Sequence, residues 1–353
     1  MEPTIGQTVT RTIEWDSDRR AVLVLDQTRL PHEVVTVRWC TVEDAARGIE
    51  CMQVRGAPLI GLAAAYGVAL AMAIDPSDAG VGAAVDRLAG TRPTAANLRW
   101  ALGRCTAALE AVAPPARAQV SRRLAAQLAD EDVAACRAIG GAGATLLERV
   151  AASQCDPARP LQVLTHCNAG RLAAVEWGTA LAPVYRWHAD GRPVHVWVSE
   201  TRPRNQGAAL TAWELADAGV AHTVIADNAS GHLLRQGLVD VCLVGADRIA
   251  ANGDVVNKIG TYLKALAARD NGVPFYVAAP TGTIDPAAPT GTGVTIEERD
   301  PDEVTRLGGV ELVPSGTAAR NWAFDVTPAA LVSAIVTERG VVPADAAGLA
   351  SLR

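Results

Sequence analysis

Lysine, aromatic residues and clusters of positive charge are all scarce in this 353-residue chain. Only two of its 32 basic residues are lysines, Lys258 and Lys264, and aromatic residues make up 4% of the sequence. The net charge is −6, and the arginines are dispersed, so the chain lacks the clustered positive charge that binds nucleic-acid phosphates. We therefore expect no nucleic-acid partner, and we expect Lys258 to serve where a compact ammonium group is needed.

Segments that would place the chain in a membrane or bind it together by disulfides are also missing. The longest apolar stretch, residues 59–74, is shorter than the roughly 20 residues that a membrane-spanning helix needs, and the first residues lack the pattern of a signal peptide. The seven cysteines never occur in Cys-x-x-Cys spacing, which disfavours a disulfide framework and a zinc site. We predict a cytoplasmic protein without membrane contact, in which residues 59–74 form a buried helix.

Motifs for the common cofactors are absent as well. No Gly-x-Gly-x-x-Gly follows a predicted strand, no phosphate-binding loop ends in Gly-Lys-Ser/Thr, and no His-Glu-x-x-His occurs. Chemistry that depends on nicotinamide, ATP or zinc is therefore disfavoured. We expect a redox-neutral reaction that uses neither a cofactor nor a metal.

The order of helical and strand-like patterns predicts an α/β protein with two domains, because 353 residues exceed what one core usually supports. Residues 11–25 have the pattern of a short β-hairpin, and Ala and Leu then recur at helical spacing over residues 41–150. From residue 161 onward, short β-branched runs alternate with helix-length segments, which indicates a parallel sheet covered by helices on both faces. We place the boundary near residue 140.

Polar residues follow each predicted strand of the parallel sheet, where ligands of such sheets bind. Cys167 follows the first strand, just before a helix predicted from about Arg171, and the helix dipole should lower the pKa of its thiol. Asp247 follows an apolar strand, where burial should raise the pKa of its carboxyl group. Both are candidate acid–base groups, although a structural thiol and an ordinary ion pair between Asp247 and Arg248 are the simpler alternatives.

Other polar residues near these strand ends are expected to have structural roles. His166 precedes Cys167 on the same strand, so its side chain should point to the opposite face and is not expected to act as the base. Asp227 and Asn228 are interpreted as helix-capping or turn residues.

Two arginine-bearing helix starts and one lysine suggest a site for a phosphate group. Arg55, Gly56 and Ala57 precede Pro58 at the start of the long apolar helix, where free N–H groups and a positive charge favour anions. Arg92 repeats this arrangement before the next helix, and Asn257 and Lys258 are expected at the start of the helix after Asp247. Ordinary capping with surface arginines is the alternative, but the combination favours a phosphate site between the two domains.

Ten short motifs along the chain resemble those of the methylthioribose-1-phosphate isomerase family. They lie at residues 54–58, 92–95, 165–170, 178–181, 200–203, 206–207, 210–215, 244–249, 257–261 and 296–300. The resemblance implies an intramolecular aldose–ketose isomerase that converts 5-methylthioribose 1-phosphate to 5-methylthioribulose 1-phosphate in methionine salvage. It also implies a homodimer, a mainly helical domain over residues 1–140 with a short β-hairpin, and a Rossmann-like catalytic domain without dinucleotide over residues 141–353.

The same resemblance assigns the site residues position by position. It implies that Cys167 and Asp247 are the catalytic pair, which agrees with the reasoning from the residues. The implied substrate-binding residues are Arg55, Gly56, Ala57, Arg92, Gln206, Asn257 and Lys258. Of these, only Gln206 comes from the resemblance alone.

The chain departs from the family pattern at Arg171 and Arg204. These departures do not change the expected type of reaction, but they allow more than one substrate. Arg171 stands one turn from Cys167, within reach of the substrate or the thiol, and it suggests an isomerase for ribose 1,5-bisphosphate; 5-deoxyribose 1-phosphate is a further alternative. Regulatory subunits of the initiation-factor exchange complex share the fold and are not enzymes, but the presence of Cys167 and Asp247 argues against that assignment. A sugar-phosphate sensor would bind without converting its ligand.

Overall fold

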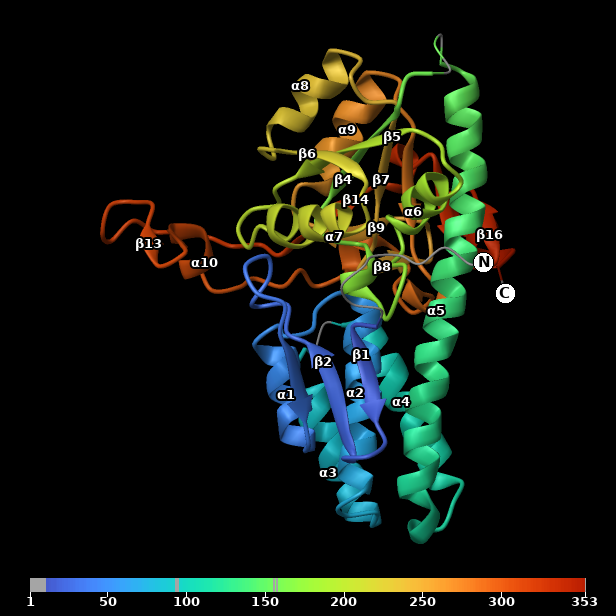
Figure 1. The fold of residues 1–353 in the computed structure, drawn as a ribbon, viewed down its shortest axis with the longest axis vertical. Coiled ribbons are helices and arrows are strands. Elements are labelled where there is room, and N and C mark those ends of the chain that lie inside the picture. Colours follow the sequence, from blue (N-terminus) through green and yellow to red (C-terminus); the bar gives the residue numbers. More distant parts are fainter. Residues whose placement is uncertain (1–10, 93–94, 155, 157, 353) are drawn as a thin grey trace.

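The computed structural model describes residues 11–92, 95–154, 156 and 158–352 (Figure 1). Cys155 and the Pro93–Thr94 part of the second predicted phosphate-binding helix start lie outside these residues. The chain opens with an antiparallel three-stranded sheet in which the predicted hairpin pairs Ile13 with Val24. A third strand extends it, so the sheet consists of β1 (Ile13–Asp16), β2 (Ala21–Leu25) and β3 (Thr36–Trp39).

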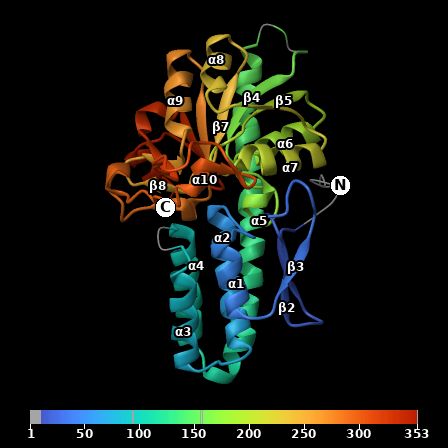
Figure 2. The same ribbon diagram turned by 90° about the vertical axis from the view of Figure 1, so that its left-hand side faces the viewer.

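Five helices follow: α1 (Val42–Glu50), α2 (Ala57–Met72), α3 (Asp78–Ala89), α4 (Ala96–Glu110) and α5 (Pro114–Ala152). The first four lie below the larger sheet, and α5 runs from beside them up along that sheet (Figure 2). Helix α2 is buried from Leu59 to Met72, which confirms the predicted core helix. Small residues let its neighbours approach closely, since a Cβ atom at Gly61 would lie 2.7 Å from the carbonyl oxygen of Asn97 in α4. Among the described helices, none combines the length and the apolar character needed to cross a membrane.

A seven-stranded sheet forms the other part of the molecule, in the order β16-β15-β10-β7-β4-β5-β6. Every neighbouring pair is parallel except β15 and β16. The strands are β4 (Leu161–His166), β5 (Val194–Ser199), β6 (Ala221–Ile225), β7 (Val241–Val244), β10 (Phe275–Ala278), β15 (Ala334–Thr337) and β16 (Gly340–Val342). The direction of winding reverses between β4 and β7, and open parallel sheets bind ligands at such a switch point.

Helices cover both faces of this sheet, as predicted, because its central strands are apolar on both sides. Val163 and Leu243 belong to the core that includes α5 and α6, whereas Leu164 and Cys242 pack with residues of α8 and α9. The helices of this part are α6 (Ala182–Ala189), α7 (Ala212–Asp217), α8 (Ala229–Arg235), α9 (Thr261–Asp270) and the C-terminal α11 (Ala346–Ala350). The α/β class with a Rossmann-like sheet is confirmed.

A second, four-stranded sheet was not predicted. It has the order β11-β8-β9-β14 and consists of β11 (Ile284–Asp285), β8 (Arg248–Ala250), β9 (Val255–Lys258) and β14 (Phe324–Thr327). Beyond it, α10 (Asp302–Thr305) and the hairpin of β12 (Arg306–Leu307) and β13 (Val310–Glu311) project from the body (Figure 1).

Helix α5 joins the helical part to the seven-stranded sheet. It runs without interruption from Pro114 to Ala152 and therefore passes through residue 140, where the domain boundary was placed. Its C-terminal half packs on α6, and Gly143 lies so close to Pro183 that a Cβ atom there would be 2.2 Å from the proline ring. The division into residues 1–140 and 141–353 stays a prediction, and the chain shows no structural break at that point.

Candidate active site

A pocket with about 730 Å³ of empty space lies between the switch point of the seven-stranded sheet and the start of helix α2. The chain reaches it from the ends of β4 and β7, from the end of β9, and from the loop before α2. All nine predicted site residues line it: Arg55, Gly56, Ala57, Arg92, Cys167, Gln206, Asp247, Asn257 and Lys258. Cys167 and Asp247 meet here because parallel strands β4 and β7 present their carboxyl ends to the same edge. The loop before α2 and the end of β9 complete the pocket from outside this sheet.

The main chain of Cys167, at the rim of the pocket, has an unusual conformation. Its φ is 63°, in the left-handed region that residues other than glycine seldom adopt. Two contacts hold this conformation: the Cys167 N–H donates to Thr201 Oγ1 at 2.8 Å, and the Cys167 carbonyl accepts from Thr211 Oγ1 at 2.7 Å. Such backbone conformations persist only where surrounding contacts enforce them, and they cluster at functional sites.

The predicted lowering of the Cys167 pKa is wrong. Burial raises the pKa of the thiol, and the nearby positive charges of Arg55 and Lys258 only partly oppose this effect. The α-helix expected from Arg171 is absent from this described segment, where a single 3-10 turn spans Arg171–Ala173. A turn of three residues has no summed dipole comparable to that of a helix, so the expected stabilisation of the thiolate is lost.

Asp247 behaves as predicted, because burial raises the pKa of its carboxyl group against the opposing charges of Lys258 and Arg55. Its main chain is fixed by the N–H, which donates to the carbonyl of Val256 on β9 at 3.0 Å. The neighbouring Arg248 forms an ion pair of 3.0 Å with Asp285. A raised pKa makes this carboxyl group a better proton donor than an ordinary exposed aspartate.

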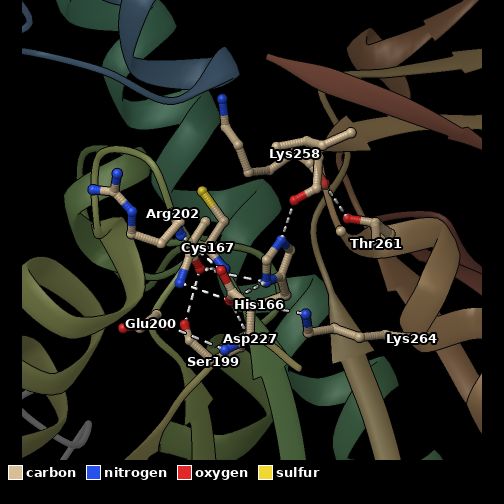
Figure 3. A network of polar contacts seen from close by, with 12 residues as sticks. His166, Cys167, Ser199, Glu200, Arg202, Asp227, Lys258, Thr261 and Lys264 are labelled. Carbon is tan, nitrogen blue, oxygen red and sulfur yellow. Dashed lines mark hydrogen bonds and ion pairs between the residues drawn. The ribbon is translucent and has the colours of Figure 1, made fainter. Parts of the chain in front are cut away.

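Asn257 and Lys258 lie in the pocket, but not at a helix start as expected. They end strand β9, and helix α9 begins three residues later at Thr261. Lys258 Nζ lies 4.5 Å from the centre of the Phe324 ring, a cation–π contact across the β9–β14 pair. In Figure 3 the Lys258 side chain and the Cys167 sulfur point in the same direction, away from Asp227. Burial lowers the pKa of Lys258, while the charges of Cys167 and Asp247 act in the opposite direction.

A buried hydrogen-bond chain behind the pocket links the two parts of the molecule. Arg55 donates to both the side chain and the carbonyl of Asn168, and the Asn168 amide donates to Glu214 and, at 3.1 Å, to Thr211. Glu214 is fully buried and also accepts from Tyr185 Oη at 2.9 Å. Sequence reasoning gave no role to Asn168, Glu214 or Tyr185, although the first two lie in recognised motifs, because only the fold brings them together.

Unsatisfied polar atoms in the pocket wall indicate where a ligand would bind. Arg92 Nε and Gln206 Oε1 are buried and have no hydrogen-bond partner among the described residues, although Arg92 Nη2 pairs with Glu297 at 3.4 Å. Native proteins seldom leave buried polar atoms unpaired, so these atoms are candidates for ligand contacts. Gly56 precedes α2 with a φ of 95°, and the helix start with Ala57 at its first position offers free N–H groups to an anion.

The two departures from the family pattern have structural partners outside the pocket. Arg171 is buried, pairs with Asp217, and lies 5.2 Å from the centre of the Trp213 ring. The described residues that line the pocket do not include Arg171, which removes the observation that suggested a bisphosphate substrate. Arg204 pairs with Glu303 of α10 at 2.9 Å. Asp227, interpreted as a capping residue, accepts from Ser199 and from two main-chain N–H groups near Thr201 (Figure 3).

Comparison with known proteins identifies the family of this chain. Residues 53–344 match the Initiation factor 2 subunit family. Proteins named methylthioribose-1-phosphate isomerase from Dechloromonas aromatica and Methylorubrum extorquens are 55% and 57% identical to this chain, and each match covers 97% of this chain and 96% of the relative. The crystal structure of 5-methylthioribose 1-phosphate isomerase from Pyrococcus horikoshii superposes with a TM-score of 0.87 at 40% identity and covers 98% and 96% of the two chains.

A second solved structure carries a different name. It is the translation initiation factor eIF-2B subunit delta from A. fulgidus, with a TM-score of 0.80 and 40% identity over 94% of this chain and 96% of that one.

Proposed function

The chain belongs to the Initiation factor 2 subunit family and, within it, to the methylthioribose-1-phosphate isomerases, and we propose that it converts 5-methylthioribose 1-phosphate to 5-methylthioribulose 1-phosphate in methionine salvage. One observation carries the proposal beyond the family: a thiol and a carboxyl group with a raised pKa line one pocket together with Arg55 and Lys258. This set supplies an acid, a group that can accept a proton, and positive charge for a phosphate.

The proposed chemistry starts from the phosphate on the anomeric carbon, which blocks the free aldehyde. Asp247, whose pKa is raised by burial, gives its proton to the ring oxygen as the bond between that oxygen and C1 breaks. Cys167 then takes the proton from C2 to form an enol phosphate, and the proton returns at C1 as the C2 oxygen becomes a carbonyl. In the other possible route, hydrogen moves from C2 to C1 as hydride while Cys167 accepts the proton of the C2 hydroxyl group.

The remaining pocket residues are proposed to bind the substrate. Arg55, Lys258 and the N–H groups at Gly56 and Ala57 provide the charge and donors that a phosphate group requires. Arg92 Nε supplies a further unpaired donor and Gln206 Oε1 an unpaired acceptor for the sugar hydroxyl groups. The Asn257 amide, which donates to Thr261 Oγ1 at 3.0 Å, also lines the pocket. The raised thiol pKa makes the exclusion of water and the correct placement of charges important for either route.

A turnover assay tests the proposed function. The purified chain is given 5-methylthioribose 1-phosphate, 5-deoxyribose 1-phosphate and ribose 1,5-bisphosphate, and ketose phosphate is measured. We expect the highest kcat/KM with the first sugar, while a higher value with another sugar would move the assignment to that substrate. If the folded protein turned over none of them and bound a translation initiation factor, the isomerase assignment would be wrong.

Deuterium at C2 of the substrate separates the two chemical routes. Exchange of the label into water supports proton abstraction by Cys167, and full retention at C1 supports hydride transfer.

We also propose that the protein acts as a cytoplasmic homodimer with two domains per chain. The family resemblance supports the dimer, and the six described cysteines, all of them free thiols, fit a reducing compartment. Analytical ultracentrifugation of the full chain would show a species of twice the chain mass, and a monomer at all concentrations would exclude the dimer. Fluorescence imaging of the tagged protein would test its location.

A further inference from the structure

His166 lies between the segment that carries Cys167 and the segment that carries Lys258 (Figure 3). It is the last residue of β4, and its side chain is completely buried. Nε2 lies 2.7 Å from the carbonyl oxygen of Ile259, and Nδ1 lies 3.3 Å from Thr201 Oγ1. Because a carbonyl only accepts, Nε2 carries the hydrogen. In the neutral ring Nδ1 faces Thr201 Oγ1 with its lone pair and shares the single hydroxyl hydrogen with the carbonyl of Ser199, which accepts it at 2.8 Å.

The contact with Ile259 fixes the end of strand β9. Ile259 directly follows Lys258 and precedes Gly260, whose φ is 100°. A Cβ atom at Gly260 would lie 3.2 Å from Cε1 and Nε2 of the imidazole, so the ring packs closely on this turn. The direction in which Lys258 leaves the strand therefore depends on the position of the His166 ring.

The contact with Thr201 connects the other side of the imidazole ring to Cys167. Thr201 Oγ1 accepts the Cys167 N–H at 2.8 Å, which is one of the two bonds that hold Cys167 in its left-handed conformation. Thr201 is itself left-handed, with a φ of 68°, and its N–H donates to Asp227 at 2.8 Å. The His166 imidazole thus contacts both Thr201, which holds the main chain of Cys167, and Ile259, which directly follows Lys258.

We propose that His166 is a positioning residue that fixes the Cys167 thiol relative to the Lys258 ammonium group, through one contact on each side of its ring. This inference rests on the proposed function for the roles of Cys167 and Lys258. The arrangement requires a neutral ring, and burial, followed by the charge of Lys264, lowers the pKa of His166 to about 3. Asp227, 3.8 Å from Nδ1, opposes this effect but does not overcome it.

Two amide substitutions separate the contacts. In His166→Gln the side-chain amide can reach the position of Nε2 and donate to Ile259, whereas in His166→Asn the shorter amide reaches only the position of Nδ1. We expect His166→Asn to lower kcat/KM about 100-fold, since small displacements of catalytic groups cost this much. His166→Gln keeps the 2.7 Å contact with Ile259 and loses only the longer and weaker one of 3.3 Å to Thr201, so it should stay within about fivefold of the wild type. His188→Asn, on the exposed face of α6, is the matched control.

A second readout does not require turnover. In a Cys40→Ser/Cys51→Ser/Cys155→Ser background, which removes the two exposed thiols among the described residues and the cysteine that lies outside them, alkylation of Cys167 by iodoacetamide is followed at increasing concentrations of inorganic phosphate. We expect the phosphate concentration that half-protects Cys167 to rise about tenfold in His166→Asn and to change little in His166→Gln. If the wild type failed to isomerise the sugar but showed this difference, the proposed function would be wrong while the positioning role would remain.

Equal behaviour of the Asn and Gln variants in both readouts, with both proteins folded, would overturn the inference. If the His166 variants do not fold, Thr201→Val and Thr201→Ser test the same link, because only serine keeps the oxygen that binds the Cys167 N–H. We expect the alkylation rate of Cys167 to change in the valine variant and to be restored in the serine variant. Identical rates in these two variants would also contradict the proposed link.

Discussion

Arg55 Nη2 donates a hydrogen bond of 2.8 Å to the main-chain carbonyl of Asn168, the residue after Cys167, across 113 positions of sequence. Arg55 comes from the helical part and Asn168 from the seven-stranded sheet, so this pair joins the two parts directly behind the pocket. The same guanidinium is among the positive charges that favour the Cys167 thiolate. The Arg55 side chain therefore both links the two parts of the molecule and favours the thiolate form of Cys167.

Arg55→Lys should keep the charge but lose the double contact, because an ammonium group cannot donate to both oxygens of Asn168 in the planar geometry of a guanidinium. We expect kcat/KM to fall roughly 10- to 100-fold, the cost of one or two charged hydrogen bonds. Steady-state kinetics check this, with Arg47→Lys on the exposed side of α1 as the control. A loss below twofold in Arg55→Lys would show that charge alone is sufficient at this position.

Cys167→Ser and Asp247→Asn should lower turnover while substrate binding is largely preserved, because each removes a proton-transfer group without removing a phosphate contact. We expect each kcat to fall by a factor of about 10² to 10⁴, with KM changed much less. Cys51→Ser, at an exposed thiol, is the control for the cysteine variant. Near-full turnover in either variant would exclude the acid–base role of that residue.

Much of this site follows from short-range sequence features. The apolar runs of β4 and β7 are bounded by polar residues, so Cys167 and Asp247 could be placed at the same edge of a parallel sheet before the structure was known. Burial of Asp247 follows from the same apolar run, and the direction of its pKa shift was predicted correctly.

Long-range packing explains what the sequence did not reveal. Asn257 and Lys258 were expected at a helix start, but antiparallel pairing with β14 holds them in a strand, and this pairing has no local signal. The pKa of Cys167 was expected to fall because a helix was expected after it; the short turn there gives no comparable dipole, and burial dominates. Glu214 became part of the site only through Asn168 and Tyr185.

Lys258→Met should raise the pKa of Cys167 further, because it removes one of the positive charges that favour the thiolate against burial. The pH at which the alkylation rate of Cys167 is half-maximal should therefore move upward, and the activity profile should move in the same direction if the thiolate is the base. The rate of iodoacetamide modification as a function of pH measures this. Arg235→Met, on the exposed side of α8, is the control, and a downward shift in Lys258→Met would contradict the assigned electrostatics.

Asp132 on α5 lies outside the active site, and its carboxyl group should make the stability of the protein depend on pH. Burial, and to a smaller extent the charge of Glu176, raises the pKa of its carboxyl group to about 7, although the group accepts from the Val175 N–H at 2.9 Å. The native state therefore holds a proton that the unfolded state, with a pKa near 3.8, has released. The contribution of this group to the free energy of unfolding is fully present below pH 4 and is lost as the pH rises through about 7.

Asp132→Asn removes this ionisation and keeps an oxygen that can accept from Val175. We expect the variant to unfold with a free energy about 1 to 3 kcal/mol higher than the wild type at pH 8 and to match the wild type near pH 4. Urea unfolding at the two pH values measures the difference. An equal difference at both pH values would show that packing, and not ionisation, separates the two proteins.

Gly56→Ala tests whether the start of α2 must approach the segment after Cys167. Gly56 has a φ of 95°, and a Cβ atom there would lie 2.6 Å from the Ala173 Cβ and 2.7 Å from the Ala173 Cα. The substitution therefore combines backbone strain with a clash, and the helix start has to move away from the pocket. We expect a loss of about 1 to 3 kcal/mol in unfolding free energy and a fall of about 100-fold in kcat/KM.

Gly82→Ala in α3 is the matched control for this prediction, because a Cβ atom at Gly82 meets no atom within 4 Å. Alanine should stabilise that helix by roughly 0.5 to 1 kcal/mol without changing kcat/KM. If Gly56→Ala lost stability but kept its activity, the close approach would serve folding alone, and the helix start would have to be removed from the proposed phosphate site. A parallel loss of phosphate protection at Cys167 would instead connect the strained glycine with anion binding.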